Sequence, residues 1–344
     1  MRCATILTMT AMLSASAAAQ QNPPATPNIQ ALQGKTVIDD ADNTVIRGWV
    51  TDRANALTHG SRTAIGDLLR TNAGTPDFRQ AYVAGCIQVL GSAYKNADQR
   101  AAAQMLTALG AFKEPAAYRV FVEALGDQRV SVRAAAARGL RILRKSIPQA
   151  GAAAFGEVLS ALRDAGKKES APVVLKLIFQ AMNFREVLPN PPDPKLNAAA
   201  ILDVLAARAR QYADGSVKAV AADTPGLAAA AAVLAQYQDA DRNRLIAATA
   251  TMMRFALNRY ADELHKVEDK KSGPLLIAQR NQIELLIRQG ETLLTALLSP
   301  GAGRPDVFKQ IGENKITEMK NQWAEWVKLL QAAVNTDFSL DKNG

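Results

Sequence analysis

The chain has 344 residues, of which 41 are Lys or Arg and 32 are Asp or Glu, so its formal charge is +9 at pH 7. This length is enough for one extended helical array or two compact domains. The positive balance favours acidic partners over basic ones. Beyond the N-terminus, no apolar run approaches the ~20 residues that a membrane-spanning helix needs.

The first 19 residues have the pattern of a secretory signal. One cation at Arg2 precedes an apolar-leaning run over residues 4–13, and the small residues 17–19 follow it. This order predicts cleavage near Ala19-Gln20 and a soluble exported chain, periplasmic or extracellular. Removal of residues 1–19 takes Cys3 away and leaves Cys86, so no internal disulfide is expected.

The rest of the chain predicts helices throughout, because apolar residues recur at three- and four-residue spacing and no stretch alternates with a period of two. A polar, proline-rich leader comes first, and a second proline-rich segment, VLPNPPDP, interrupts the helices after residue 186. The predicted division is a signal (1–19), a disordered leader (20–36), helical repeats (37–186), a linker (187–194), alanine-rich helical repeats (195–240), a bundle of longer helices (241–336) and a disordered tail (337–344).

The clearest repeat lies at residues 117–145, where two short amphipathic helices flank a turn at Gly126-Asp127. Each helix carries one apolar stripe and needs similar neighbours to bury it. An earlier stripe matches this unit at an offset of 34, and Arg100 resembles Arg133 at 33, as a stacked helical array would require. The residues matched at 34 are Ala102, Leu106 and Leu109 with Ala136, Leu140 and Leu143.

These residues resemble the D-x4-V-R-x-A-A-x3-L core of HEAT-like repeats, without the proline that often precedes the Asp. The resemblance covers about 30 residues. It implies an armadillo-type α-α superhelix, and it implies that the Asp and the Arg bond across the turn and to the next repeat. The structural repeat residues are then Asp127, Val132, Arg133, Ala136 and Leu140.

The cations of the second helix allow two interpretations. Either the arginines bond within the scaffold and the others are solvated, or together they form a basic contact surface. The candidate partner-binding residues are Arg133, Arg138, Arg141 and Arg144. Trp323 and Trp326 allow a similar choice, because they could be core residues or anchors for a partner.

No catalytic, cofactor or metal site is expected. His59 and His265 are the only histidines, and no HExxH, CxxC, P-loop, G-x-S-x-G or dinucleotide-binding pattern occurs. The predicted protein is therefore a non-enzymatic scaffold that binds another protein. The alternative is binding of an anionic envelope polymer or a membrane surface through the basic face. No nucleic-acid partner is expected of an exported chain.

Overall fold

The computed structural model describes residues 28–217, 219–268, 271–298 and 304–341. This part of the chain is all-α and contains no strand, as the helical spacing predicts. The predicted signal (1–19) and most of the predicted leader lie outside the described residues. The α-helices are α1 (Ile29–Leu32), α2 (Asp40–Thr58), α3 (Ala64–Thr71), α4 (Pro76–Ala93), α5 (Gln99–Phe112), α6 (Tyr118–Ala124), α7 (Val130–Leu143), α8 (Ala152–Lys168), α9 (Pro172–Met182), α10 (Pro194–Ala213), α11 (Asp223–Ala232), α12 (Asp239–Asp262), α13 (Pro274–Leu298), α14 (Val307–Gly312) and α15 (Ile316–Val334).

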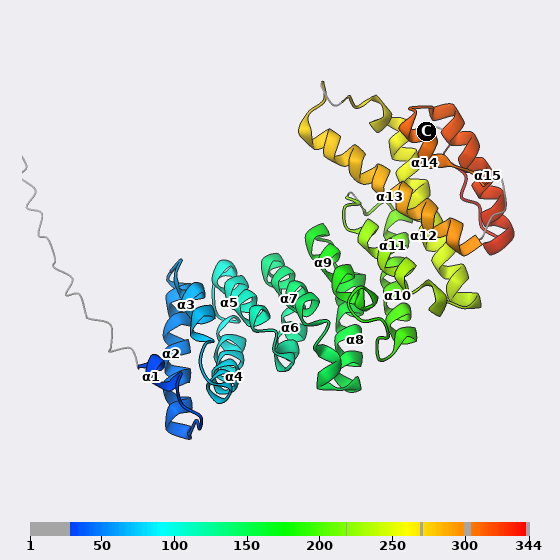
Figure 1. The fold of residues 1–344 in the computed structure, drawn as a ribbon. Coiled ribbons are helices and arrows are strands. Elements are labelled where there is room, and N and C mark those ends of the chain that lie inside the picture. Colours follow the sequence, from blue (N-terminus) through cyan, green and yellow to red (C-terminus); the bar gives the residue numbers. More distant parts are fainter. Residues whose placement is uncertain (1–27, 218, 269–270, 299–303, 342–344) are drawn as a thin grey trace, which may run out of the picture.

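From α2 to α13 the helices form successive antiparallel pairs that stack side by side (Figure 1). The odd-numbered helices make one row, in which α5, α7, α9, α11 and α13 each pack on the next. The even-numbered helices make the opposite row, where α8, α10 and α12 pack in order. Toward α13 the stack turns to its odd-numbered side, so that row lines the inner side of the curve.

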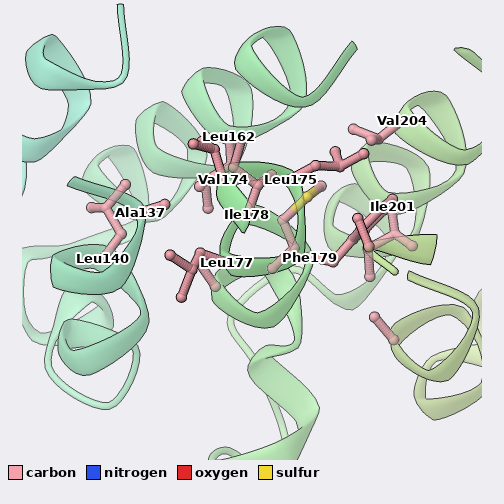
Figure 2. Close-up of a cluster of buried hydrophobic side chains, with 14 of the residues drawn as sticks. Ala137, Leu140, Leu162, Val174, Leu175, Leu177, Ile178, Phe179, Ile201 and Val204 are labelled. Carbon is pink, nitrogen blue, oxygen red and sulfur yellow. The ribbon is translucent and has the colours of Figure 1, made fainter. Parts of the chain in front are cut away.

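The apolar stripes meet between the rows in one continuous core. In Figure 2, Leu177 of α9 points toward Leu140 of α7, and Phe179 points toward Ile201 of α10. These side chains are buried, and burial of each Leu, Ile or Phe contributes about 1.5–3 kcal/mol to folding. One helical pair therefore depends on both of its neighbours for most of its stability.

Two glycines set the spacing between α5 and α7. A Cβ on Gly110 would lie 3.4 Å from the Cα of Gly139, so the two backbones approach closely there. A Cβ on Gly139 would lie 2.4 Å from the ring of Phe121 in α6. A side chain at Gly139 would therefore displace the Phe121 ring, and any side chain at Gly110 larger than alanine would meet the backbone of α7.

The repeat register differs from the one that the sequence suggests. Helices α5 and α7 have equal length, and both their first residues (Gln99, Val130) and their last residues (Phe112, Leu143) lie 31 positions apart. The sequence offset of 33–34 is therefore two or three residues too long. Buried alanines cover a wide arc of both helices, so small residues match at several offsets.

The proline-rich segment 187–194 connects two repeats and does not interrupt the core. Helix α8 packs on α10 and α9 packs on α11 across this segment. The helices after it belong to the same hydrophobic cluster as those before it. Helix α9 ends at Met182, before the first of these prolines, and Pro194 is the first residue of α10.

The apolar spacing within 241–336 predicts three long helices, at about 242–267, 274–298 and 315–334. Helices α12, α13 and α15 lie close to these positions, and α13 has the predicted bounds Pro274–Leu298. Helices α14 and α15 pack on α12 and α13, which also continue the two rows, so the expected bundle is fused to the array. The sequence did not indicate α14. Trp323 and Trp326 are core residues, 1% and 0% exposed. Trp326 Nε1 donates to the buried carboxylate of Glu291 at 3.0 Å.

Both segments expected to be disordered are ordered in part. In the leader, Ile29 and Leu32 are buried, and the Thr75 amide donates to the carbonyl of Gln33 at 2.9 Å. In the tail, Phe338 is 4% exposed and its carbonyl accepts from Trp323 Nε1 at 2.9 Å. Each segment is held by one or two buried apolar side chains. The average composition of a whole segment does not reveal such single contacts.

No helix in the described parts of the chain combines the length and hydrophobicity needed to cross a bilayer.

We expect Gly139→Ala to lower the free energy of unfolding by about 1–3 kcal/mol, because its Cβ would overlap the Phe121 ring in a packed core. Gly156→Ala is the control. It also lies within a helix, but its nearest neighbour is 3.9 Å away, and alanine there raises stability by about 0.5–1 kcal/mol. Urea unfolding followed by circular dichroism measures both changes. Equal effects of the two substitutions would contradict the close packing at Gly139.

Candidate functional site

Three successive helices of the odd-numbered row carry positive charge and no carboxylate. Helices α5, α7 and α9 contain no Asp or Glu. The even-numbered helices α4, α6 and α8 carry both signs. The cations of the three odd-numbered helices are Arg100, Arg133, Arg138, Arg141 and Lys176.

Each of these helices packs on its partner and on its odd-numbered neighbours, which leaves one side of it exposed. We call the exposed side of α5, α7 and α9 the odd-helix face. On α7, at about 100° per residue, its exposed side chains fall within an arc of about 120°. The charged and β-branched apolar members of the face are Arg100, Val130, Arg138, Arg141, Ile142, Val173 and Lys176.

Arg138 and Arg141 are the two sequence candidates that remain available for a partner. Both side chains are exposed, and neither forms an ion pair within the described part of the chain. Lys176 on α9 is exposed in the same way. A cation without a neighbouring carboxylate attracts an incoming anion without first losing a partner.

Apolar side chains lie among these cations. Val130 and Ile142 of α7 are each 41% exposed, and Val173 of α9 is 55% exposed. The face therefore combines separate positive charges with apolar contact area.

Arg133 bonds within the scaffold. Its Nε and Nη2 donate to Glu169 at 2.7 and 2.9 Å, and its Nη1 donates to the carbonyls of Asp127 and Gln128 at 2.9 Å. Glu169 precedes α9, so this bidentate pair joins one repeat to the next. The cross-turn contact and the contact to the neighbouring repeat are those that the HEAT-like resemblance implies for the Arg.

The Asp of the motif is held by a residue that the sequence did not single out. Arg129 donates to Asp127 through Nε at 2.9 Å and through Nη2 at 2.7 Å. The same guanidinium reaches back to the carbonyls of Tyr94 and Ala97 in the preceding repeat, at 3.2 and 2.5 Å. Arg129 and Arg133 thus tie the loop before α7 to the repeats on both sides. The D-x-R spacing was the available signal for Arg129.

Arg144 is a second tie and not part of a contact surface. It is 4% exposed, and its Nη1 donates to the carbonyl of Asn183 at 2.5 Å and to Glu186 at 2.9 Å. These partners follow α9, so Arg144 joins the opposite end of the same two repeats. Of the four candidate arginines, Arg138 and Arg141 are therefore exposed, whereas Arg133 and Arg144 bond within the scaffold. Val132, Ala136 and Leu140 are fully buried, as the repeat motif implies.

Hydrogen bonds keep the Asp127 and Glu169 carboxylates ionised. The bond from Arg129 lowers the pKa of Asp127 below its ordinary value, and burial opposes this only in part. Burial alone would raise the pKa of Glu169, but the bonds from Arg133 and from the Ala171 amide outweigh it and lower that pKa. Both groups stabilise the fold as anions.

A groove of about 460 Å³ lies beside the Arg133–Glu169 pair, between the C-terminal ends of α6 and α8. Its carboxylates already have partners. Asp127 pairs with Arg129, Asp164 with Arg163, and Glu169 with Arg133. The three carboxylates that line the groove are thus each bonded to an arginine.

Metal-ligating side chains do not cluster in the described residues. No group of three or more His, Cys, Asp and Glu side chains there is placed to hold a metal ion. Cys86 is fully buried, and its burial raises the pKa of the thiol to about 12. Such a thiol is protonated at neutral pH and unreactive.

We expect Glu169→Gln to lower the free energy of unfolding by about 2 kcal/mol at pH 7, because it removes the charge of a buried bidentate partner. The folded-state pKa of Glu169 lies below its ordinary value. Its contribution is therefore complete above the unfolded-state pKa of about 4.5 and disappears as the pH falls through the lower, folded-state value. The difference from the unsubstituted chain should shrink at pH 3.

The matched control is Glu123→Gln, since Glu123 pairs with Lys95 and both side chains are about half exposed. An exposed pair contributes about 0–1 kcal/mol, so little change is expected at either pH. Urea unfolding at the two pH values measures both variants. A loss from Glu169→Gln that stays constant between pH 7 and pH 3 would contradict the ionised tie.

A scan against protein-family models finds no match to this chain, and neither curated proteins nor solved structures yield one. The functional interpretation therefore depends on the residues and geometry described above.

Proposed function

We propose that this chain is an exported, non-enzymatic scaffold of HEAT-like repeats that binds an acidic, partly apolar polypeptide on its odd-helix face. The observation that carries the proposal is the charge of α5, α7 and α9. Three adjacent helices present cations and no carboxylate on the inner side of the curve. Stacked repeats suit this role because they present a long continuous surface.

The apolar members of the face favour a polypeptide over an anionic polymer. Val130, Ile142 and Val173 expose 41–55% of their surface between the cations. A polysaccharide or nucleic acid chain is held chiefly by its charges and gains little from such side chains. An acidic segment with one apolar stripe would match both the charges and the apolar area.

The ties between repeats support the same role. Arg129, Arg133 and Arg144 fix α7 to the repeats before and after it at both ends of the helix. The exposed cations on α7 and α9 are therefore held at a fixed separation. A surface that is already ordered loses little conformational entropy when a partner binds.

Export and the HEAT-like assignment belong to the proposal as sequence predictions. The signal-like order of residues 1–19 and the motif at Asp127 and Arg133 support them. Cleavage near Ala19-Gln20 lowers the formal charge from +9 to +8, so the mature chain stays basic.

The test reverses charge at Arg138, Arg141 and Lys176 together, each to Glu, because these side chains are exposed on the face and none takes part in a tie between repeats. The control reverses Lys167, Lys195 and Arg210, three exposed cations of the even-numbered helices α8 and α10. Both variants change net charge equally. The probe is a labelled helical peptide with Glu at its polar positions and Leu along one face.

We expect the odd-helix reversal to weaken binding of this peptide at least tenfold, or about 1.4 kcal/mol, and the control to leave it nearly unchanged. Fluorescence anisotropy measures both at physiological ionic strength. Equal weakening by the two variants, or no binding by the unsubstituted chain, would contradict the proposed face.

A second pair of substitutions separates a polypeptide from a polymer or membrane partner. The double substitution Ile142→Ser/Val173→Ser should weaken binding of the Glu/Leu peptide several-fold, because it removes apolar contact area and no charge. Binding of heparin, which depends on charge, should be unaffected by this pair. If the chain binds heparin or phosphatidylglycerol vesicles more tightly than the peptide, and the Ser variants leave peptide binding unchanged, the polymer or membrane alternative replaces this proposal.

A further inference from the structure

The C-terminal segment 336–341, which follows α15 and has no helical structure, lies on the body of the protein, and we call it the strap. Its anchor is Phe338, which is 4% exposed. The indole Nε1 of Trp323 donates to the Phe338 carbonyl at 2.9 Å, so backbone and ring are both held. The aromatic side chain thus sits in a preformed position beside α15.

The acidic residue three positions later is held by polar side chains of α12. Arg254 Nη2 donates to Asp341 Oδ1 at 2.5 Å, and Asn258 Nδ2 donates to Oδ2 at 2.7 Å. The Asn258 Oδ1 atom also accepts from the Asp341 amide at 3.2 Å. An asparagine that pairs with both backbone and side chain of one residue fixes the register of an extended segment.

The strap does not fill its site. A space of about 390 Å³ remains between the strap and the ends of α10 and α12. Its wall is aromatic, with the rings of Tyr212 and Phe255 4.8 Å apart. The body residues around it, which we call the tail groove, are Tyr212, Ala213, Thr251, Arg254, Phe255 and Asn258.

One of the two attachments of the strap is exposed and weak. The side chains of Arg254 and Asp341 are 39% and 63% exposed, and an exposed pair of this kind contributes about 0–1 kcal/mol. Phe338 is the only strap residue that is fully buried among residues 336–341. The strap is thus attached by one buried ring, by the bond from Trp323 and by the exposed contacts of Asp341, and its tether to α15 keeps it next to its site.

We propose that the tail groove is a binding site for extended polypeptide segments in which an acidic residue follows an aromatic residue by three positions, and that the chain's own strap competes for it. A partner segment with a bulkier apolar residue beside the tail groove would bury more of the Tyr212 and Phe255 rings than the strap does. Because it buries more apolar surface, such a segment displaces the strap. This site lies on α10 and α12, apart from the odd-helix face, and does not depend on the function proposed for that face.

The test compares the full chain with its Phe338→Ala/Asp341→Ala variant, in which both strap anchors are removed. The probe is a labelled peptide with the sequence of residues 336–341, TDFSLD, blocked at both ends. We expect the variant to bind the peptide at least tenfold more tightly than the unsubstituted chain, because its groove is no longer occupied by the tethered strap. Fluorescence anisotropy measures the affinities.

Two controls define the recognition. A scrambled peptide of the same composition, and a peptide in which the aspartate that corresponds to Asp341 is replaced by Asn, should bind the variant at least several-fold more weakly. Circular dichroism checks that the variant is folded. If it is not, Asp341→Ala alone is used, since that side chain is mostly exposed and its loss costs little stability.

Equal affinity of the variant and the unsubstituted chain for TDFSLD would overturn the proposal, and so would equal binding of the scrambled peptide. Absence of binding to a folded variant would overturn it as well, because the open groove would then not recognise the segment that covers it.

Discussion

Each helical pair in this protein has apolar surface that it cannot bury alone, and this constraint underlies the rest of the structure. Close backbone contact at Gly110 and Gly139 brings α5 and α7 together, and the apolar stripes of the array are buried between its two rows. The guanidinium ties then fix one repeat against the next. Arg133 reaches Glu169 and Arg144 reaches Glu186, so both ends of α7 are held. The exposed side of the row takes its shape from these contacts.

The ties also explain the charge of the inner surface. The carboxylates that face the arginines of α7 lie in loops and caps at the ends of the helices, where they accept backbone and guanidinium N–H groups. Helices α5, α7 and α9 are left with cations and small or apolar residues. A surface that carries only positive charge selects acidic partners. The exposed Val and Ile side chains favour those acidic partners that also carry apolar residues.

The sequence was sufficient for the helices, because three- and four-residue spacing is a local property. The spacing predicted the observed bounds of α13. The repeat motif implied that Val132, Ala136 and Leu140 are buried, and they are. The sequence could not separate Arg138 and Arg141 from Arg133 and Arg144. All four arginines lie on or next to one helix, and only partners 36 and 42 residues away decide which of them are occupied. The same limit applies to the strap, where Trp323 and Asn258 hold a segment that is polar in composition.

Both proposed binding surfaces select acidic segments that carry apolar residues, but they do so differently. The odd-helix face is exposed and offers separated charges, whereas the tail groove is covered by the chain itself. The first suits rapid association guided by charge, and the second suits recognition of a short pattern after displacement of the strap.

Hydrogen–deuterium exchange of the full chain, with and without a saturating Glu/Leu helical peptide, tests the central claim most directly. We expect added protection to concentrate in α5, α7 and α9, with α4, α6 and α8 unchanged, because the peptide covers only the inner row. Protection confined to the even-numbered helices, or spread evenly over both rows, would contradict an odd-helix face that binds acidic polypeptides.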